Sequence, residues 1–184
     1  LCKTYGIRKP VKVVVGGATR EESVLRAALE ARADAKLLAV QDGARPLVTP
    51  ELFDAVVLRA AVCAAAAPAV PAEVITKAVA KAAKFGAAAP AIPVKDTIKV
   101  SKTGGVDETP DRSTLFAVQT PQVFDAGLLK AALQSVLTEH AALTDDCSAV
   151  ERLGKAVYLT DGDEENIKIT TPLDLIVAEA ILRR

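Results

Sequence analysis

The chain has 184 residues, a length that fits one domain with its own hydrophobic core. Its 23 basic and 23 acidic residues balance, which excludes the broadly electropositive surface that binding to nucleic acid or to an anionic membrane requires. Three scattered cysteines and one histidine give no metal-ligand spacing, and no apolar run approaches the ~20 residues of a membrane span. We therefore expect a reduced, soluble, cytoplasmic protein without metal-ligating residues of its own.

Short β-branched runs alternate with alanine-rich helical stretches in the first part of the chain. Residues 11–15 predict a strand, the apolar spacing within 24–29 predicts a helix, and the apolar run 36–40 predicts a second strand. This alternation is typical of βαβ units. It predicts an α/β fold, with a mostly parallel sheet and helices on both faces.

A tandem repeat occupies the middle of the chain. Residues 50–71 align without a gap onto residues 72–93, and each copy predicts one helix followed by one buried strand. Two copies are too few for a solenoid, so we interpret the repeat as a local duplication or an alanine-rich convergence that carries no catalytic residue. Whether it adds a strand to the sheet is left open.

The pattern changes after the repeat. Residues 96–119 are polar and turn through two glycines, which predicts a protruding β-arm. Helices are then expected over 125–139 and 145–153, a strand over 156–159, and a last helix from Pro172, because proline suits a first helical turn.

Ligands of open α/β sheets bind where strands end, so polar residues at those places are the first functional candidates. Gly16 and Gly17 leave the first predicted strand and precede a helix, so the backbone there can approach a nucleotide. An ordinary turn between strand and helix is the alternative. Asp42 and Arg45 flank two small residues at the end of the second strand and offer an acceptor beside a forked donor, with a surface salt bridge as the alternative.

The other polar candidates lie further along the chain. Thr97 stands where the arm begins, Arg112 lies in the arm, and Thr120 follows the arm just before a proline. Thr144 precedes a predicted helix, and Lys168 lies beside the start of the last helix. A charged strand edge, a proline turn, a helix cap and an exposed strand lysine explain these residues equally well when each is taken alone.

Six segments in order lead to a more specific reading: VVVGGATREESV, QDGARPLV, PVKDTIK, AVQTPQVF, LTDDCSAVE and ENIKITTPLDL. Together they make the chain resemble the 2-C-methyl-D-erythritol 4-phosphate cytidylyltransferases over nearly its whole length. The ribitol 5-phosphate cytidylyltransferases resemble it less closely. The resemblance implies a single Rossmann-like nucleotidyltransferase domain over residues 1–184, with the arm at about 96–119 joining two subunits of a homodimer.

The resemblance also implies a reaction and a set of roles. The family joins a phosphate oxygen of 2-C-methyl-D-erythritol 4-phosphate to the α-phosphorus of CTP and releases pyrophosphate, with Mg²⁺ bound mainly through the CTP phosphates. Catalytic roles would go to Lys168 and Asp42. Nucleotide binding would fall to Gly16, Gly17, Ala18, Ser23 and Gly43, and sugar-phosphate binding to Arg45, Thr97, Arg112, Thr120 and Thr144.

The sequence departs from the family pattern in two ways. The family begins with a glycine-rich loop whose arginine and lysine wrap the triphosphate, and no such loop precedes Val11. We therefore expect that these 184 residues alone bind CTP weakly and turn over poorly; the alternative is an inactive fragment that retains sugar-phosphate binding and dimerisation. Gln41 stands where the family usually has histidine, a change expected to be minor. A dinucleotide-binding oxidoreductase is disfavoured because no G-x-G-x-x-G follows the first predicted strand.

Overall fold

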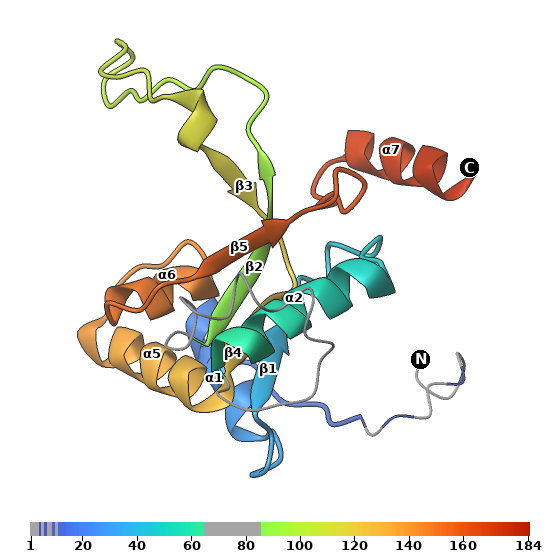
Figure 1. Ribbon diagram of the computed structural model, residues 1–184, viewed down its shortest axis with the longest axis vertical. Coiled ribbons are helices and arrows are strands. Elements are labelled where there is room, and N and C mark those ends of the chain that lie inside the picture. The colour runs from blue at the N-terminus through green and yellow to red at the C-terminus, as the bar shows by residue number, and fades with distance from the viewer. Residues whose placement is uncertain (1–3, 5, 7–8, 10, 65–85) are drawn as a thin grey trace.

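The computed structural model describes residues 4, 6, 9, 11–64 and 86–184, and its centre is one mixed sheet (Figure 1). The strand order is β1-β4-β2-β3, and β5 pairs with the other edge of β2. The strands are β1 (Leu37–Val40), β2 (Ala87–Pro93), β3 (Phe116–Val118), β4 (Gln122–Asp125) and β5 (Tyr158–Asp161).

The α/β class is confirmed, but the expectation of mostly parallel pairing is wrong for the described strands. β1, β2 and β5 run in one direction, yet β4 lies between β1 and β2 and is antiparallel to both. β3 is also antiparallel to β2, so the parallel pair is β2 with β5. The reason is the arm, because the chain leaves along β2 and comes back along β3 and β4 in the opposite direction.

Both faces of the sheet are covered, as expected. Ala87, Ala89 and Phe124 point to one face and pack in a core with α1, α5 and α6, whereas Ala88 and Val123 point to the other and pack against α2. This alternation follows from the two-residue period of a strand. The helices are α1 (Arg20–Leu29), α2 (Pro50–Ala64), α5 (Ala126–Glu139), α6 (Asp146–Arg152) and α7 (Pro172–Leu182).

Local capping explains where several helices begin. The side chains of Thr19, Asp125 and Asp145 accept hydrogen bonds from the first turns of α1, α5 and α6. Thr171 forms a reciprocal capping box with Asp174 at the start of α7. The expected helices over 24–29, 125–139, 145–153 and from Pro172 are therefore confirmed, with ends that differ by a few residues.

The strand expected over residues 11–15 is wrong. These residues form no ladder with a described strand, and Val13 and Val15 are 91% and 81% exposed. A strand needs a neighbour for its backbone N–H and C=O groups, and the local apolar pattern cannot supply one.

The tandem repeat contributes to the described fold from both copies. Its first copy forms α2, and its second copy forms β2, the strand that pairs with three others. The strand predicted from the first copy and the helix predicted from the second fall at 65–85, outside the described residues.

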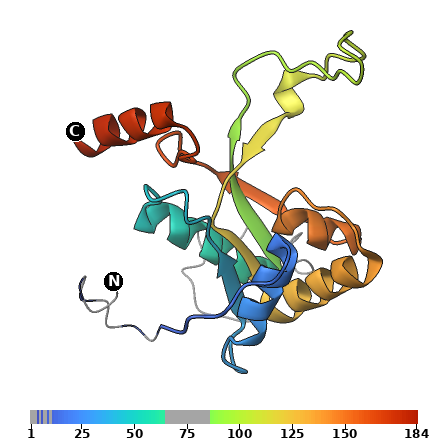
Figure 2. The same ribbon diagram turned by 180° about the vertical axis from the view of Figure 1, so that it is seen from behind.

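The arm projects beyond the helices that cover the sheet, and α7 also extends away from them (Figures 1 and 2). The arm's base is the antiparallel pair β2 and β3, and its outer part is held by a bridge between Val100 and Glu108. A single turn of 3₁₀ helix, Arg112–Thr114, leads back into β3. The predicted excursion at about 96–119 is thus present as an arm.

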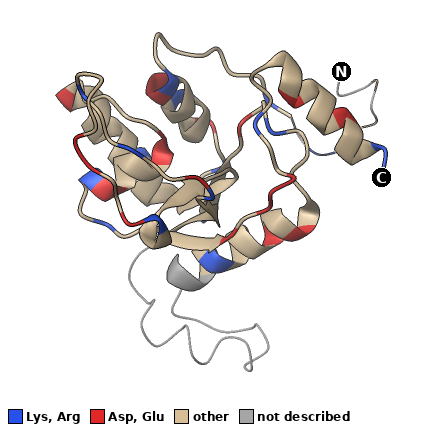
Figure 3. Cartoon of the chain, turned by 90° about the horizontal axis from the view of Figure 1, so that it is seen from above, with Lys and Arg blue, Asp and Glu red and all other residues tan. Residues whose placement is uncertain are grey.

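No helix among the described residues is both long and apolar enough to cross a membrane. Acidic and basic segments are interspersed over the ribbon (Figure 3). This distribution agrees with the balanced formal charge of the whole chain.

Gly162 lies directly after β5, beside Ala91 of β2. Its N–H donates to the carbonyl oxygen of Ala91 at 2.9 Å, and an added Cβ would lie 2.8 Å from the carbonyl carbon of Ala91. We expect Gly162→Ala to lower the free energy of unfolding by about 1–3 kcal/mol in urea denaturation, because backbone must shift to admit the methyl group. Gly105→Ala is the control, since its Cβ would meet no atom within 4 Å. Equal midpoints for the two variants would contradict this.

Candidate functional site

Four predicted site residues come together beyond the end of β1. Lys168 Nζ lies 3.0 Å from Asp42 Oδ2, and Arg45 Nε lies 3.8 Å from the same oxygen. The hydroxyl of Thr120 accepts a hydrogen bond of 3.1 Å from the backbone N–H of Asp42. One carboxylate, two cations and one hydroxyl from three distant parts of the chain thus form one cluster.

Backbone contacts hold the parts of this cluster together. The N–H of Ile169, next to Lys168, donates to the carbonyl oxygen of Ala44 at 2.8 Å. Gln41 Nε2 donates to the carbonyl oxygen of Arg45 at 3.0 Å, which closes the turn that carries Asp42. The turn after β1 is therefore closed by its own hydrogen bond and is joined to the loop before α7 beside the Asp42–Lys168 pair.

Arg45 is largely buried, and one of its buried nitrogens makes no hydrogen bond. Its Nη1 donates to the carbonyl oxygen of Asn166 at 2.7 Å, while its buried Nε has no hydrogen-bond partner. Burial lowers the pKa of Arg45, and the charge of Asp42 offsets part of that effect. A buried guanidinium with a free N–H suits an incoming oxyanion, because the anion would satisfy the donor and balance the charge.

Lys168 differs from Arg45 in its exposure. Its side chain is 50% exposed, so the ammonium can turn from Asp42 toward a ligand without leaving a buried site. Together the two cations can bind phosphate oxygens from two directions. The cluster is therefore able to neutralise negative charge on a polyanionic substrate.

Two buried polar residues that the sequence analysis passed over support the cluster. Asn166 Nδ2 donates to the carbonyl oxygen of Thr120 at 2.9 Å, and Gln119 Nε2 donates to the carbonyl oxygen of Asp163 at 2.7 Å. Both side chains are buried. Both residues lie inside the quoted segments AVQTPQVF and ENIKITTPLDL, which was the one sign in the sequence that they could matter. Their spacing does not distinguish them from amide side chains on the surface.

The backbone N–H groups of the glycine turn before α1 are hydrogen-bonded to side chains of that helix. The N–H of Gly17 donates to Ser23 Oγ at 2.9 Å, and the N–H of Ala18 donates to Glu22 Oε2 at 2.7 Å. Gly16 binds through its carbonyl oxygen, which accepts from Arg26 at 2.9 Å. A ligand that used the two N–H groups would have to displace Ser23 and Glu22 from them.

Gly43 lies in the turn between Asp42 and Arg45, and a Cβ there would meet nothing within 4 Å. It is part of the same turn as the cluster. The space beside it leaves the backbone open to a ligand.

Thr144 belongs to a neighbouring pocket. A cavity of about 620 Å³ opens between β3, β5 and the start of α6, with Thr144 and Asp145 on its wall. Asp42 and Lys168 do not line this cavity. The hydroxyl of Thr144 shares a hydrogen bond of 2.8 Å with Ser148, and the residue that caps α6 is Asp145 rather than Thr144.

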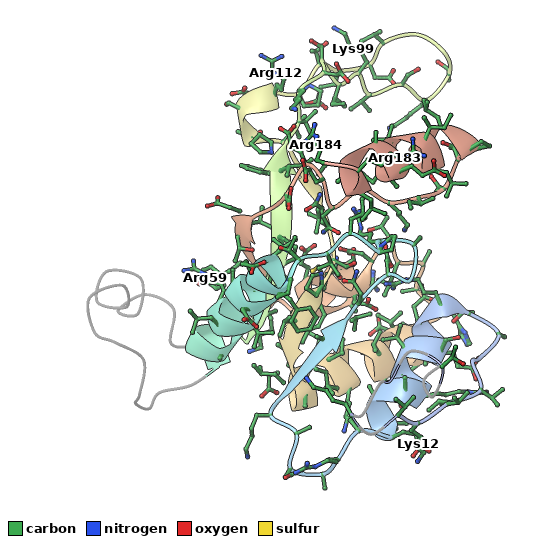
Figure 4. The ribbon with its side chains drawn as sticks, turned by 90° about the vertical axis from the view of Figure 1, so that its right-hand side faces the viewer. Lys12, Arg59, Lys99, Arg112, Arg183 and Arg184 are labelled. Carbon is green, nitrogen blue, oxygen red and sulfur yellow. The ribbon has the colours of Figure 1, made fainter. Side chains whose placement is uncertain are left out.

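Thr97 and Arg112 are not brought to the cluster within one chain. Both are exposed on the arm, where Arg112 Nη1 donates to the carbonyl oxygen of Lys95 at 2.9 Å. Figure 4 shows Arg112 and Lys99 both on the arm, well away from Arg59 on α2. A ligand at the Asp42 cluster would meet these side chains only if an arm reached it from elsewhere.

Nearly the whole chain matches the model of one protein family. The profile of the 2-C-methyl-D-erythritol 4-phosphate cytidylyltransferase family matches residues 2–83 and 59–184. The two matched stretches overlap inside the tandem repeat, as expected if both copies correspond to one segment of the family.

Curated relatives carry the same name. The protein from Syntrophotalea carbinolica is 41% identical over 180 residues, which cover 97% of this chain and 67% of the relative. The protein from Caldanaerobacter subterraneus subsp. tengcongensis is 42% identical over 177 residues, covering 96% and 68%. The chain thus spans about two thirds of the length of the curated relatives it matches.

Solved structures agree with the sequence comparisons. The 2-C-methyl-D-erythritol 4-phosphate cytidylyltransferase of Thermus thermophilus superimposes with a TM-score of 0.71 at 31% identity, covering 97% of this chain and 78% of that one. The 4-diphosphocytidyl-2C-methyl-D-erythritol synthase of Anaerococcus prevotii gives a TM-score of 0.78 at 29% identity, covering 98% and 71%.

Proposed function

This chain belongs to the 2-C-methyl-D-erythritol 4-phosphate cytidylyltransferase family, and we propose that it transfers the cytidylyl group of CTP to 2-C-methyl-D-erythritol 4-phosphate in the non-mevalonate route to isoprenoid precursors. The observation that carries this proposal is the cluster in which Lys168 and Arg45 converge on Asp42. Two phosphate-bearing substrates require cations held in fixed positions, and this cluster provides them.

The transfer exchanges one phosphoanhydride bond for another. A phosphate oxygen of the sugar phosphate forms a bond to the α-phosphorus of CTP, the bond from that phosphorus to the bridging oxygen breaks, and pyrophosphate leaves with the bonding electrons. No covalent bond to the enzyme forms. Lys168 would bind the reacting phosphates as negative charge builds up, and Asp42 would hold its ammonium in place beforehand.

The two substrates would occupy opposite sides of the cluster. Arg45 and Thr120 would bind the sugar phosphate, with Thr144 contributing from the neighbouring pocket. The Nε of Arg45 lies 3.8 Å from Asp42 Oδ2 and has no hydrogen-bond partner, which supports this role because a phosphate oxygen is the acceptor it lacks. Asp42 and Gly43 would lie near the ribose and the incoming phosphate oxygen.

The nucleotide base would lie against the turn before α1, where Gly17, Ala18 and Ser23 would face the cytosine beside Gly16. Support comes from the position of this turn at the start of α1, with Ser23 on the first turn of the helix. A cytosine would replace the internal hydrogen bonds of Gly17 and Ala18 by bonds to its own polar edge.

Mg²⁺ would enter with CTP. The described residues contain no group of three or more His, Cys, Asp and Glu side chains able to hold a metal ion, so a cage made by these residues does not fit. An ion bound mainly through CTP phosphates does fit, since Mg²⁺ typically keeps few protein ligands. When bound, it neutralises phosphate charge.

The arm would make a homodimer and complete the site. Thr97 and Arg112 are exposed on the arm and would reach the sugar phosphate bound by the partner subunit, in an isologous exchange about a two-fold axis. We expect a dimer in sedimentation at micromolar concentration, and a monomer there would contradict this. We also place the enzyme in the cytoplasm.

Product analysis tests the proposed function. The purified protein, with the triphosphate loop of the family present, is supplied with CTP, Mg²⁺ and either 2-C-methyl-D-erythritol 4-phosphate or ribitol 5-phosphate, and pyrophosphate and the cytidine diphosphate product are measured. We expect a higher kcat/KM with the methylerythritol substrate. A higher kcat/KM with ribitol 5-phosphate would contradict the proposed substrate, and sugar-phosphate binding without any turnover would indicate an inactive member of the family.

A further inference from the structure

A second charged pair lies beside the proposed site and has no role in the reaction described above. Arg20 Nη1 and Nη2 donate to Asp146 Oδ1 and Oδ2 at 3.0 and 2.6 Å, a two-pronged contact. The side chain of Asp146 is fully buried, whereas that of Arg20 is 40% exposed. The two residues lie 126 positions apart in the chain.

Each partner belongs to a segment that carries proposed binding residues. Arg20 is the first residue of α1 and follows the turn that contains Gly17 and Ala18. Asp146 is the first residue of α6 and follows Thr144 by two positions. The pair therefore joins the nucleotide side of the site directly to the sugar-phosphate side.

On the α6 side, the residues on either side of Asp146 are hydrogen-bonded to Gln122. Gln122 Nε2 donates to Asp145 Oδ2 at 2.7 Å, and Gln122 Oε1 accepts from the N–H of Cys147 at 3.2 Å. Gln122 begins β4, two residues after Thr120 in the Asp42 cluster. Through Asp146 and its neighbours, Arg20 is thus linked to the start of β4, two residues after Thr120.

The pair also lies within electrostatic range of the proposed catalytic carboxylate. The hydrogen bond with Asp146 is the main cause that raises the pKa of Arg20, and the charge of Asp42 adds to it. Burial raises the pKa of Asp146, and the charges of Asp145 and Asp42 act in the same direction against the opposing effect of Arg20. Arg20 therefore compensates a buried negative charge close to Asp42.

A buried ion pair is weak support for stability alone, because desolvation of the two charges offsets most of their attraction. An apolar pair of similar size would fill the same space without that cost. The position of this pair between two binding segments indicates another use.

We propose that Arg20 is a positioning residue for cytidylyl transfer, whose two-pronged contact with Asp146 fixes the nucleotide turn relative to the sugar-phosphate side of the site. This inference rests on the proposed function. Each substrate would still bind to its own side without the contact, but the attacking oxygen and the α-phosphorus would lose their alignment. Misplacement of reacting groups by about 1 Å costs roughly 100-fold in rate.

Arg20→Lys is the decisive variant, because it keeps the positive charge beside Asp146 and removes the forked geometry. The parent and the variant are compared in kcat at saturating substrates and in calorimetric binding of CTP with Mg²⁺ and of the sugar phosphate, each alone. We expect kcat to fall about tenfold, with both Kd values within about threefold of the parent and unchanged binding stoichiometry. Arg20→Gln should lower kcat further, by about 100-fold.

Arg152→Gln is the matched control, since it removes an exposed ion pair between α6 and α5, that of Arg152 with Glu139. We expect it to leave kcat unchanged. A parental kcat in Arg20→Lys would overturn the inference. A loss of kcat matched by an equal loss of binding stoichiometry would also overturn the inference, because it would mean that a smaller fraction of the protein is folded. A parent protein that neither binds nor turns over these substrates would instead refute the proposed function itself.

Discussion

Lys168→Ala is expected to lower kcat by about 100-fold or more while changing KM for CTP much less, because the ammonium acts where charge builds up in the transition state. In the free protein this ammonium lies 3.0 Å from Asp42 and remains half exposed. Steady-state kinetics with both substrates varied in turn separate the effect on kcat from the effect on KM.

Stability should change little in this variant. Asp42 keeps Arg45 at 3.8 Å and the hydroxyl of Thr120 on its backbone N–H, so no fully buried charge is left alone. Arg183→Ala is a suitable control, since it removes an exposed pair with Glu179 on α7, downstream of Lys168. If Lys168→Ala retained the parental kcat, the catalytic role proposed for Lys168 would be wrong even though the family assignment stands.

Arg112→Lys is expected to raise KM for the sugar phosphate by about tenfold or more and to leave KM for CTP nearly unchanged, because lysine cannot copy a two-pronged contact with phosphate. Arg112 is exposed on the arm and donates a hydrogen bond to the carbonyl oxygen of Lys95. Among the described residues, no contact joins it to the Asp42 cluster of its own chain. Equal changes in both KM values would contradict a role confined to the sugar phosphate.

Subunit mixing tests whether Arg112 acts on the partner's site. A dimer of one Lys168→Ala chain and one Arg112→Ala chain would contain one site with both defects and one site with neither. We therefore expect the mixed dimer to recover about half of the parental activity, although each variant alone is nearly inactive. No recovery in verified mixed dimers would show that Arg112 serves its own chain.

The sequence alone determined those parts of the molecule that depend on neighbours in the chain. The helices α1, α5, α6 and α7 were predictable because each has its capping residue and its apolar spacing within one or two turns. The family, and with it the reaction, followed from the order of six short segments. The arm was predictable because a polar, glycine-turned stretch cannot enter a core.

The tertiary structure alone decided how these parts meet. Nothing local places β4 between β1 and β2, because pairing partners are chosen by the packing of both sheet faces. Residues 11–15 have the apolar pattern of a strand, yet a strand exists only with a neighbour for its backbone groups. The contact of Arg20 with Asp146 joins residues 126 positions apart, a distance at which sequence pattern carries no information about proximity.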